Sequence, residues 1–100
     1  MNKYQFTSQA ASDLVEIWNF IAEDNPTAAD EVAEAIFRGC ELLADSPHIG
    51  RFREDLTSLP VRFWVVQPYS NYLIVYRPEE KPLQVIRLLH AARDVSTLLR

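Results

Sequence analysis

The spacing of the hydrophobic residues changes halfway along this chain, and that change is the strongest constraint on its fold. Before residue 46 apolar side chains recur every three to four residues, as on one face of an amphipathic helix. After residue 60 they alternate with polar ones, as in a β-strand. The segment Ser46–Gly50 between them contains both proline and glycine, the strongest breakers of regular structure. The pattern therefore predicts an α+β fold in which helices pack on a sheet.

Two helices are predicted in the first half of the chain. Thr7 or Ser8 can cap the first helix by accepting an early backbone N–H. Its apolar stripe consists of Leu14, Ile17, Trp18 and Ile21. Asn25 and Pro26 suit the cap and first turn of a second helix, which we expect to run to about Asp45. Because the joint between the helices is so short, they should form an antiparallel hairpin.

Four strands and a last helical turn complete the prediction. The strands are expected at Tyr4–Thr7, Val61–Val66, Tyr72–Tyr76 and from Leu83 to about His90, and the helical turn within Asp94–Leu99. Residues 51–60 are expected to form an irregular connection. The chain contains no repeat or linker, so one domain of 100 residues is expected. The element order is β-α-α-β-β-β, with an antiparallel sheet and the helical hairpin on one face.

The last two predicted strands are apolar on both faces. In the last strand Leu83, Val85 and Leu89 share one face by parity, and Ile86 and Leu88 the other. A helical hairpin can cover only one face of such a sheet. The other face would then expose an apolar patch, which usually marks a protein interface. The alternative is that the 51–60 connection and the C-terminal segment cover it.

Charge and composition exclude several classes of protein. The formal net charge of −4 divides into −7 for residues 1–50 and +3 for residues 51–100, so the average describes neither half. The N-terminus lacks the apolar stretch of a signal peptide, and no apolar run approaches the roughly 20 residues that span a bilayer. Cys40 is the single cysteine, which excludes an internal disulfide and a cysteine-based zinc site, and its helical position predicts a buried residue. We expect a cytoplasmic protein with no metal and no cofactor.

Several motifs, in this order, resemble the ParE/RelE toxin superfamily. They are Asp13-Leu14 with Ile17 and Ile21, Asn25-Pro26-x-Ala28-Ala29, Ser46-Pro47-x-x-Gly50-Arg51, Tyr72-Leu73-Ile74-Val75-Tyr76-Arg77, and Val85-Ile86-Arg87-Leu88-Leu89-His90-x-Ala92-Arg93-Asp94. The resemblance spans nearly the whole chain. It implies the β-α-α-β-β-β fold and the role of a type II toxin, as in plasmid stabilisation, neutralised by a small antitoxin encoded beside it.

Two mechanisms exist within this superfamily. RelE-like members are ribosome-dependent endoribonucleases that cut mRNA, and metal-free cleavage needs a base, an acid and cations for the phosphorane. On that alternative Arg62, His90 and Arg93 would be the catalytic residues. The RelE pattern, however, has a tyrosine a few residues beyond the last arginine, and Val95–Leu99 contains no aromatic residue. An acidic first half is also a poor ligand for ribosomal RNA.

ParE-like members perform no known chemistry and poison DNA gyrase, and this sequence resembles them more. On this interpretation the chain has no catalytic residue, and an amphipathic antitoxin segment lies in an apolar groove or adds a strand to the sheet. The expected partner-binding residues are Arg62, Tyr72, Ile74, Tyr76, Val85, Arg87, Leu89 and Arg93. Arg87 is expected either to pair with an acidic residue of the partner or to be a solvated edge charge. His90 is expected to be structural, and Asp94 to be either a helix cap or a functional carboxylate.

Overall fold

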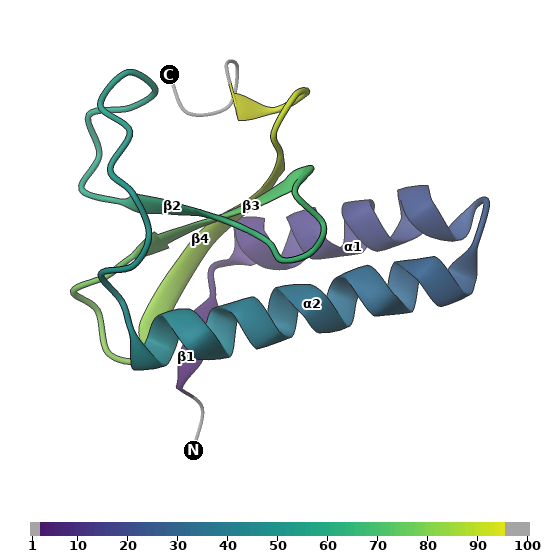
Figure 1. Cartoon of the computed structure of the whole chain (residues 1–100), viewed down its shortest axis with the longest axis horizontal. Coiled ribbons are helices and arrows are strands. Elements are labelled where there is room, and N and C mark those ends of the chain that lie inside the picture. Colours follow the sequence, from purple (N-terminus) through teal and green to yellow (C-terminus); the bar gives the residue numbers. More distant parts are fainter. Residues whose placement is uncertain (1–2, 96–100) are drawn as a thin grey trace.

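The computed structural model describes residues 3–95, and its elements follow the predicted order. They are β1 (Tyr4–Phe6), α1 (Ser8–Ala22), α2 (Pro26–Asp45), β2 (Arg62–Val65), β3 (Tyr72–Arg77) and β4 (Leu83–His90). The helical turn expected within Asp94–Leu99 lies outside the described residues, apart from Asp94 and Val95. The α+β class and the β-α-α-β-β-β order are thus confirmed (Figure 1).

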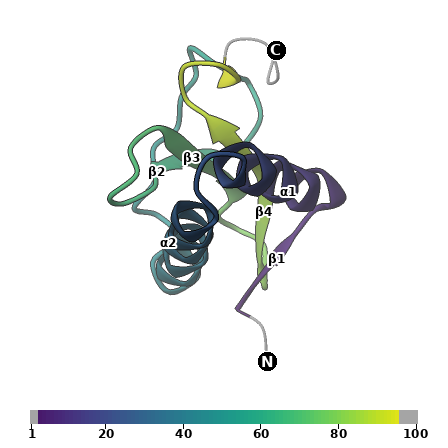
Figure 2. The same ribbon diagram turned by 90° about the vertical axis from the view of Figure 1, so that its right-hand side faces the viewer.

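Both helices begin where their capping residues predict. The Thr7 hydroxyl accepts a hydrogen bond from the Ala10 N–H at 3.1 Å, which makes Thr7, not Ser8, the cap of α1. The Asn25 side chain accepts from the Ala28 N–H at 3.1 Å, and Pro26 occupies the first turn of α2. The two helices form an antiparallel hairpin that lies against one face of the sheet (Figures 1 and 2). None of the helices within residues 3–95 has the length and apolar character needed to cross a bilayer.

The sheet has the strand order β1-β4-β3-β2 and is mixed, whereas an antiparallel sheet was predicted. The pairs β2–β3 and β3–β4 are antiparallel, but β1 runs parallel to β4. The prediction was wrong at β1 because no hairpin turn joins that strand to its neighbour. Its direction depends on how the helical hairpin returns the chain to the sheet, which period-two alternation does not report.

The core between the helices and the sheet contains most of the buried apolar side chains. From β3 and β4 it includes Tyr72, Ile74, Tyr76, Leu83, Val85 and Leu88, from the residue after β2 Val66, and from the helices Ala10, Ile17, Val32, Ala35, Ile36, Cys40 and Leu43. Cys40 is fully buried, as predicted, and burial raises the pKa of its thiol to about 12, with a smaller contribution from the charge of Glu41. The thiol is therefore not a nucleophile at neutral pH.

The opposite face of the sheet carries a second, smaller apolar cluster, and the chain itself covers it. The cluster consists of Val61, Phe63, Leu73, Val75 and Leu89. Leu56, Ile86 and Val95 pack against it. In Figure 1 the helices lie below the sheet, and the 51–60 connection with the segment after β4 lies above it. An exposed second face was therefore the wrong prediction, and cover by these two segments is the arrangement found.

A β-bulge in β4 changes which residues share a face. Val75 of β3 pairs with Arg87, whereas the next residue, Tyr76, pairs with Val85, so Ile86 is an extra residue in β4. An extra residue reverses the facing of every side chain beyond it. The parity prediction that Val85 and Leu89 share a face is wrong for this reason, since Val85 belongs to the helix-side core and Leu89 to the second cluster.

Candidate functional site

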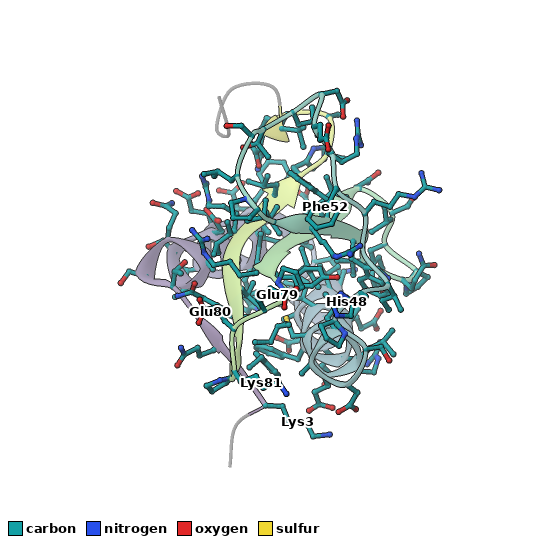
Figure 3. The ribbon with its side chains drawn as sticks, turned by 90° about the vertical axis from the view of Figure 1, so that its left-hand side faces the viewer. Lys3, His48, Phe52, Glu79, Glu80 and Lys81 are labelled. Carbon is teal, nitrogen blue, oxygen red and sulfur yellow. The ribbon has the colours of Figure 1, made fainter. Side chains whose placement is uncertain are left out.

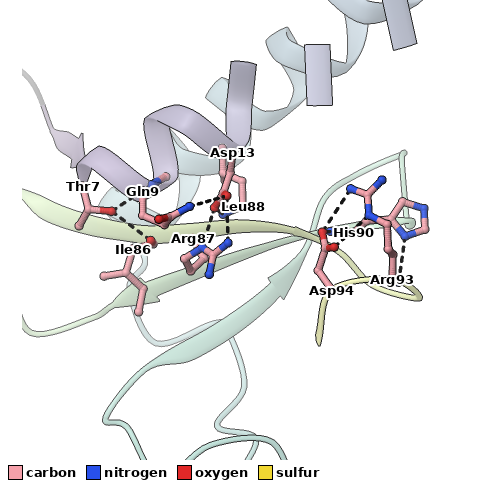
Figure 4. Close-up of polar contacts among 10 residues, drawn as sticks. Thr7, Gln9, Asp13, Ile86, Arg87, Leu88, His90, Arg93 and Asp94 are labelled. Carbon is pink, nitrogen blue, oxygen red and sulfur yellow. Dashed lines mark hydrogen bonds and ion pairs between the residues drawn. The ribbon is translucent and has the colours of Figure 1, made fainter. Parts of the chain in front are cut away.

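A buried ion pair joins α1 to the edge of β4. Arg87 donates to the Asp13 carboxylate from Nε at 2.8 Å and from a terminal nitrogen at 3.0 Å (Figure 4). The same carboxylate accepts the Leu88 N–H at 3.0 Å and the Gln9 side-chain amide at 3.3 Å. Only 5% of the Asp13 side chain is exposed, and the hydrogen bond to Asp13 raises the pKa of Arg87. Arg87 is thus paired within the chain, which neither alternative for this residue anticipated.

A second polar cluster lies where β4 ends. The Asp94 carboxylate accepts the His90 N–H at 2.8 Å and Arg93 Nε at 2.9 Å, while the Arg93 N–H donates to His90 Nδ1 at 3.3 Å (Figure 4). The His90 ring meets the edge of the Tyr72 ring at 5.5 Å. Burial acts to raise the pKa of Asp94, but the hydrogen bonds from Arg93 and His90 outweigh it and lower that pKa. His90 and Asp94 therefore shape the turn after β4.

A shallow groove of about 260 Å³ connects the two polar clusters along α1. Besides the charged residues already described, Glu16, Ile17, Phe20 and Leu88 line it. Phe20 is 62% exposed, and the Arg93 guanidinium lies 5.9 Å from the centre of its ring. The groove thus combines an exposed aromatic side chain with charges of both signs, which suits a protein partner.

Arg62 lies at the opposite end of the sheet and binds the turn after α2. Its guanidinium donates to the carbonyl of Gly50 at 2.7 Å and of His48 at 3.3 Å, and it lies 4.1 Å from the centre of the Phe52 ring. Its Nε is buried without a hydrogen-bond partner. The adjacent Tyr76 hydroxyl accepts the Gly50 N–H at 3.0 Å and donates to the Pro47 carbonyl at 2.7 Å. Arg62 and Tyr76 together hold this turn against the sheet.

The three residues of the ribonuclease alternative do not meet in one place. Arg62 pairs with Tyr76 on β3, whereas His90 pairs with Tyr72, four residues away along the same strand. Four residues of a strand span roughly 13 Å. The Arg62 side chain is also bound to carbonyls of the turn, away from His90 and Arg93. One phosphodiester could not contact all three groups in this arrangement.

Most of the residues predicted to bind a partner lie in the interior. Tyr72 and Leu89 are buried, as are Ile74, Tyr76 and Val85. They are buried in the free chain because the helices cover one face of β3 and β4 and the chain's own segments cover the other, so their contact with a partner stays a prediction. Of the predicted partner residues, only Arg62 and Arg93 have part of the side chain exposed without being held in a buried ion pair.

Asp13, the partner of Arg87, was not among the predicted site residues. A signal was present, since Asp13 lies three residues after Ala10 and four before Ile17, both of which are buried. A carboxylate on the buried stripe of a helix requires a donor, and an arginine on an adjacent strand is the expected one. The pairing itself joins residues 74 positions apart, which periodicity cannot predict.

A further cavity, of about 660 Å³, lies between the end of α2 and the turn from β3 to β4. The residues that line it are Lys3, Ala44, Pro47, Pro78, Glu80, Lys81, Pro82 and Leu83. Figure 3 labels three of them, Lys3, Glu80 and Lys81. His48, in the turn after α2, is exposed. Within residues 3–95 no three histidine, cysteine, aspartate or glutamate side chains gather as ligands for a metal ion.

Comparison with known proteins agrees with the fold. The chain is similar to a chain in a solved structure titled "Chromosomal ParDE TA system from P. aeruginosa", with a TM-score of 0.69 and 21% identity, over 87% of this chain and 92% of that one. It is also 31% identical, over 93 residues, to "Toxin RelE2" of Caulobacter vibrioides, which covers 93% of this chain and 99% of that protein.

A family model described as "ParE toxin of type II toxin-antitoxin system, parDE" matches residues 4–95. The fold and this match together define the class of protein as the toxins of type II toxin–antitoxin systems. Within that class the chain belongs to the ParE toxin family.

Proposed function

We propose that this protein is a cytoplasmic toxin that inhibits DNA gyrase without cleaving a substrate itself, acting as one domain over residues 1–100. The observation that carries the proposal is the separation of Arg62 from His90 and Arg93 by most of the length of β3. Membership of the ParE family supports gyrase as the target, and a role in plasmid stabilisation accords with it. No metal or cofactor enters this function.

The cognate antitoxin is the second partner in this proposal. It would hold the toxin inactive through a protein–protein interface. Arg93, beside the exposed Phe20, is our candidate for a contact with gyrase or the antitoxin, and Arg62 is a second. Arginine and aromatic side chains are the residues most often responsible for binding energy at such interfaces. Arg87 would act indirectly by fixing α1 against β4.

Cleavage of mRNA on the ribosome is the competing function, because the Caulobacter relative bears the name Toxin RelE2. His90 Nδ1 is engaged by the Arg93 N–H, so only Nε2 would be available as a base or acid. Arg93 is bound to it through its backbone N–H, and the guanidinium of that arginine is already paired with Asp94. Cleavage of a phosphodiester without a metal needs a base, an acid and cations that stabilise the phosphorane. His90 and Arg93 alone do not supply all of these groups.

Two assays with the purified toxin distinguish these functions. We expect micromolar toxin to abolish supercoiling by gyrase and the Arg93→Ala variant to lose at least about tenfold in potency. The Arg38→Ala variant, a matched change at an exposed position of α2, should retain it. Translating extracts should show no toxin-dependent cuts in mRNA. Full gyrase activity in the presence of folded toxin contradicts the proposal, and mRNA cuts lost in His90→Ala establish the alternative.

A further inference from the structure

The 51–60 connection is a loop whose two ends meet at β2. At one end Arg51 exchanges two backbone hydrogen bonds with Phe63, both at 2.8 Å. At the other end Val61, only 1% exposed, brings the chain back into the sheet two residues before Phe63. The residues between therefore leave the sheet and return to the same place, on the side away from the helices (Figure 1). Compact loops of this geometry are frequently functional.

Between its ends the loop is supported mainly by its own hydrogen bonds. The N–H groups of Leu56 and Thr57 donate to the Arg53 carbonyl at 2.9 and 3.1 Å, and the Arg53 guanidinium binds Asp55 at 3.0 and 2.8 Å. Within the described part of the chain, no hydrogen bond of residues 53–60 reaches a helix or a strand. Leu56 alone packs inward, on the second cluster. The rest of the loop is a projection from the body of the protein.

Two large apolar side chains are exposed on this projection. Phe52 is 51% exposed and Leu59 is 45% exposed. The Arg62 guanidinium, which is bound to the carbonyls of the preceding turn, lies 4.1 Å from the centre of the Phe52 ring and so fixes the ring in place. A hollow of about 520 Å³ is lined entirely by loop residues, Phe52, Arg53, Glu54, Thr57, Ser58, Leu59 and Pro60. Apolar groups held exposed in a fixed position are typical of a binding surface.

The charge at the base of the loop is positive and is not neutralised by the chain itself. Among residues 3–95 neither Arg51 nor Arg62 has a carboxylate partner, whereas Arg53, Arg87 and Arg93 each bind an aspartate. Glu54 is the remaining charge of the loop, because Asp55 is paired with Arg53. An acidic partner surface is therefore complementary to the base of the loop.

We propose that the 51–60 loop inserts into a recess of gyrase, with Phe52 and Leu59 in apolar contact and Arg51 beside acidic groups at the rim. This rests on the proposed inhibition of gyrase and adds which part of the toxin makes the contact. A projecting loop fits a concave site on a larger protein. A small partner that binds as a strand or helix needs a sheet edge or a groove instead, so the shape favours gyrase over the antitoxin as the occupant.

Supercoiling assays with purified variants test this contact. Leu59→Asp and Arg51→Glu should each need at least about tenfold more toxin for half-inhibition of gyrase. The controls make the same changes at exposed positions of α2: Leu42→Asp, also at a residue 45% exposed, and Arg38→Glu should stay within about twofold of the wild type. Their unfolding midpoints should match, because all four side chains are exposed. Unchanged potency of Leu59→Asp overturns the loop contact alone, whereas a wild-type toxin that leaves gyrase fully active contradicts the proposed function as well.

Two binding measurements identify any other occupant of the loop. Calorimetric titration with the small protein encoded in the neighbouring reading frame should give an affinity for Leu59→Asp within about twofold of the wild type. An affinity at least about tenfold weaker assigns the loop to the antitoxin and overturns the inference. Sedimentation of the wild-type toxin at micromolar concentration should show a monomer. A dimer that Leu59→Asp dissociates assigns the loop to a second copy of this chain and also overturns it.

Discussion

A carboxylate is stable in a protein interior only when hydrogen bonds replace the water that it loses. The Asp13 carboxylate meets this requirement because it accepts four hydrogen bonds, two from Arg87, one from the Leu88 N–H and one from the Gln9 side chain. One acidic side chain therefore fixes the position of α1 along β4 and occupies a backbone N–H at the edge of that strand. The sequence indicates that Asp13 lies on the buried stripe of its helix, but it does not indicate which residue pairs with it.

Removal of Arg87 should be costly because it leaves the Asp13 charge buried without its cation. We expect Arg87→Met to lower the free energy of unfolding by about 3 kcal/mol in chemical denaturation. The double variant Asp13→Leu/Arg87→Met should lose less than the sum of the two single variants, because it buries no charge. Additive losses would show that the two side chains act independently.

Asp94 should make stability depend on pH in the acid range. Its pKa is lowered in the folded protein, so its stabilising effect is complete above the ordinary carboxyl pKa of about 4 and disappears as the pH falls through the lower folded value. We expect Asp94→Asn to be less stable by about 1 kcal/mol at pH 7. That gap should narrow below about pH 4 in denaturation curves measured from pH 7 to pH 2.5. A gap that stays constant across this range contradicts the assignment.

At the scale of elements, α2 packs on the sheet through a glycine. A Cβ at Gly39 would lie 2.8 Å from Cζ3 of Trp64 and 2.9 Å from Cδ1 of Ile74, closer than packed atoms come. Gly39 therefore lets α2 approach β2 and β3 at the middle of the sheet. The sequence contains this glycine inside a predicted helix. The need for a glycine there comes from side chains of the neighbouring strands, not from the helix itself.

Gly39→Ala should consequently destabilise the protein although alanine is the better helix former. Helix propensity alone would give a gain of about 1 kcal/mol, whereas forcing the methyl group against Trp64 costs about 1–3 kcal/mol. We expect a net loss in thermal unfolding. The double variant Gly39→Ala/Trp64→Leu should recover most of it, because the smaller side chain makes room. A more stable Gly39→Ala protein would contradict the close approach.

At the scale of the whole molecule, both faces of the sheet are covered without a partner. The helical hairpin covers one face, and Leu56 with Val95 helps to cover the other. The acidic residues of the first half are mostly exposed on the helices, whereas the net positive charge of the second half belongs to the sheet and its loops. The free toxin should therefore be a folded protein rather than one completed by its antitoxin.

The purified toxin should accordingly unfold in one cooperative transition and bind little 1-anilinonaphthalene-8-sulfonate at neutral pH. Leu56→Asp should raise dye binding and lower the unfolding midpoint, because it removes part of the cover from the second cluster. Leu59→Asp, a matched change at an exposed position in the same connection, should alter neither. Strong dye binding by the wild-type toxin would show that the second face is open in solution.

The sequence by itself determined the type and order of the elements, their capping residues and their approximate ends. Those features depend on contacts within a few residues, and period, caps and turn residues report such contacts directly. It also carried the family motifs, and with them the class of protein. Two predicted arginines, Arg62 and Arg93, remain candidates for binding.

Only the tertiary structure decided the direction of β1, the bulge at Ile86, the cover over the second face and the pairing of Asp13 with Arg87. Each of these depends on segments far apart in the chain, such as the 74 positions between Asp13 and Arg87. A hydrophobic pattern records that a side chain is buried and on which side of its own element it lies. It does not record which distant segment buries it, because many partners would satisfy the same pattern.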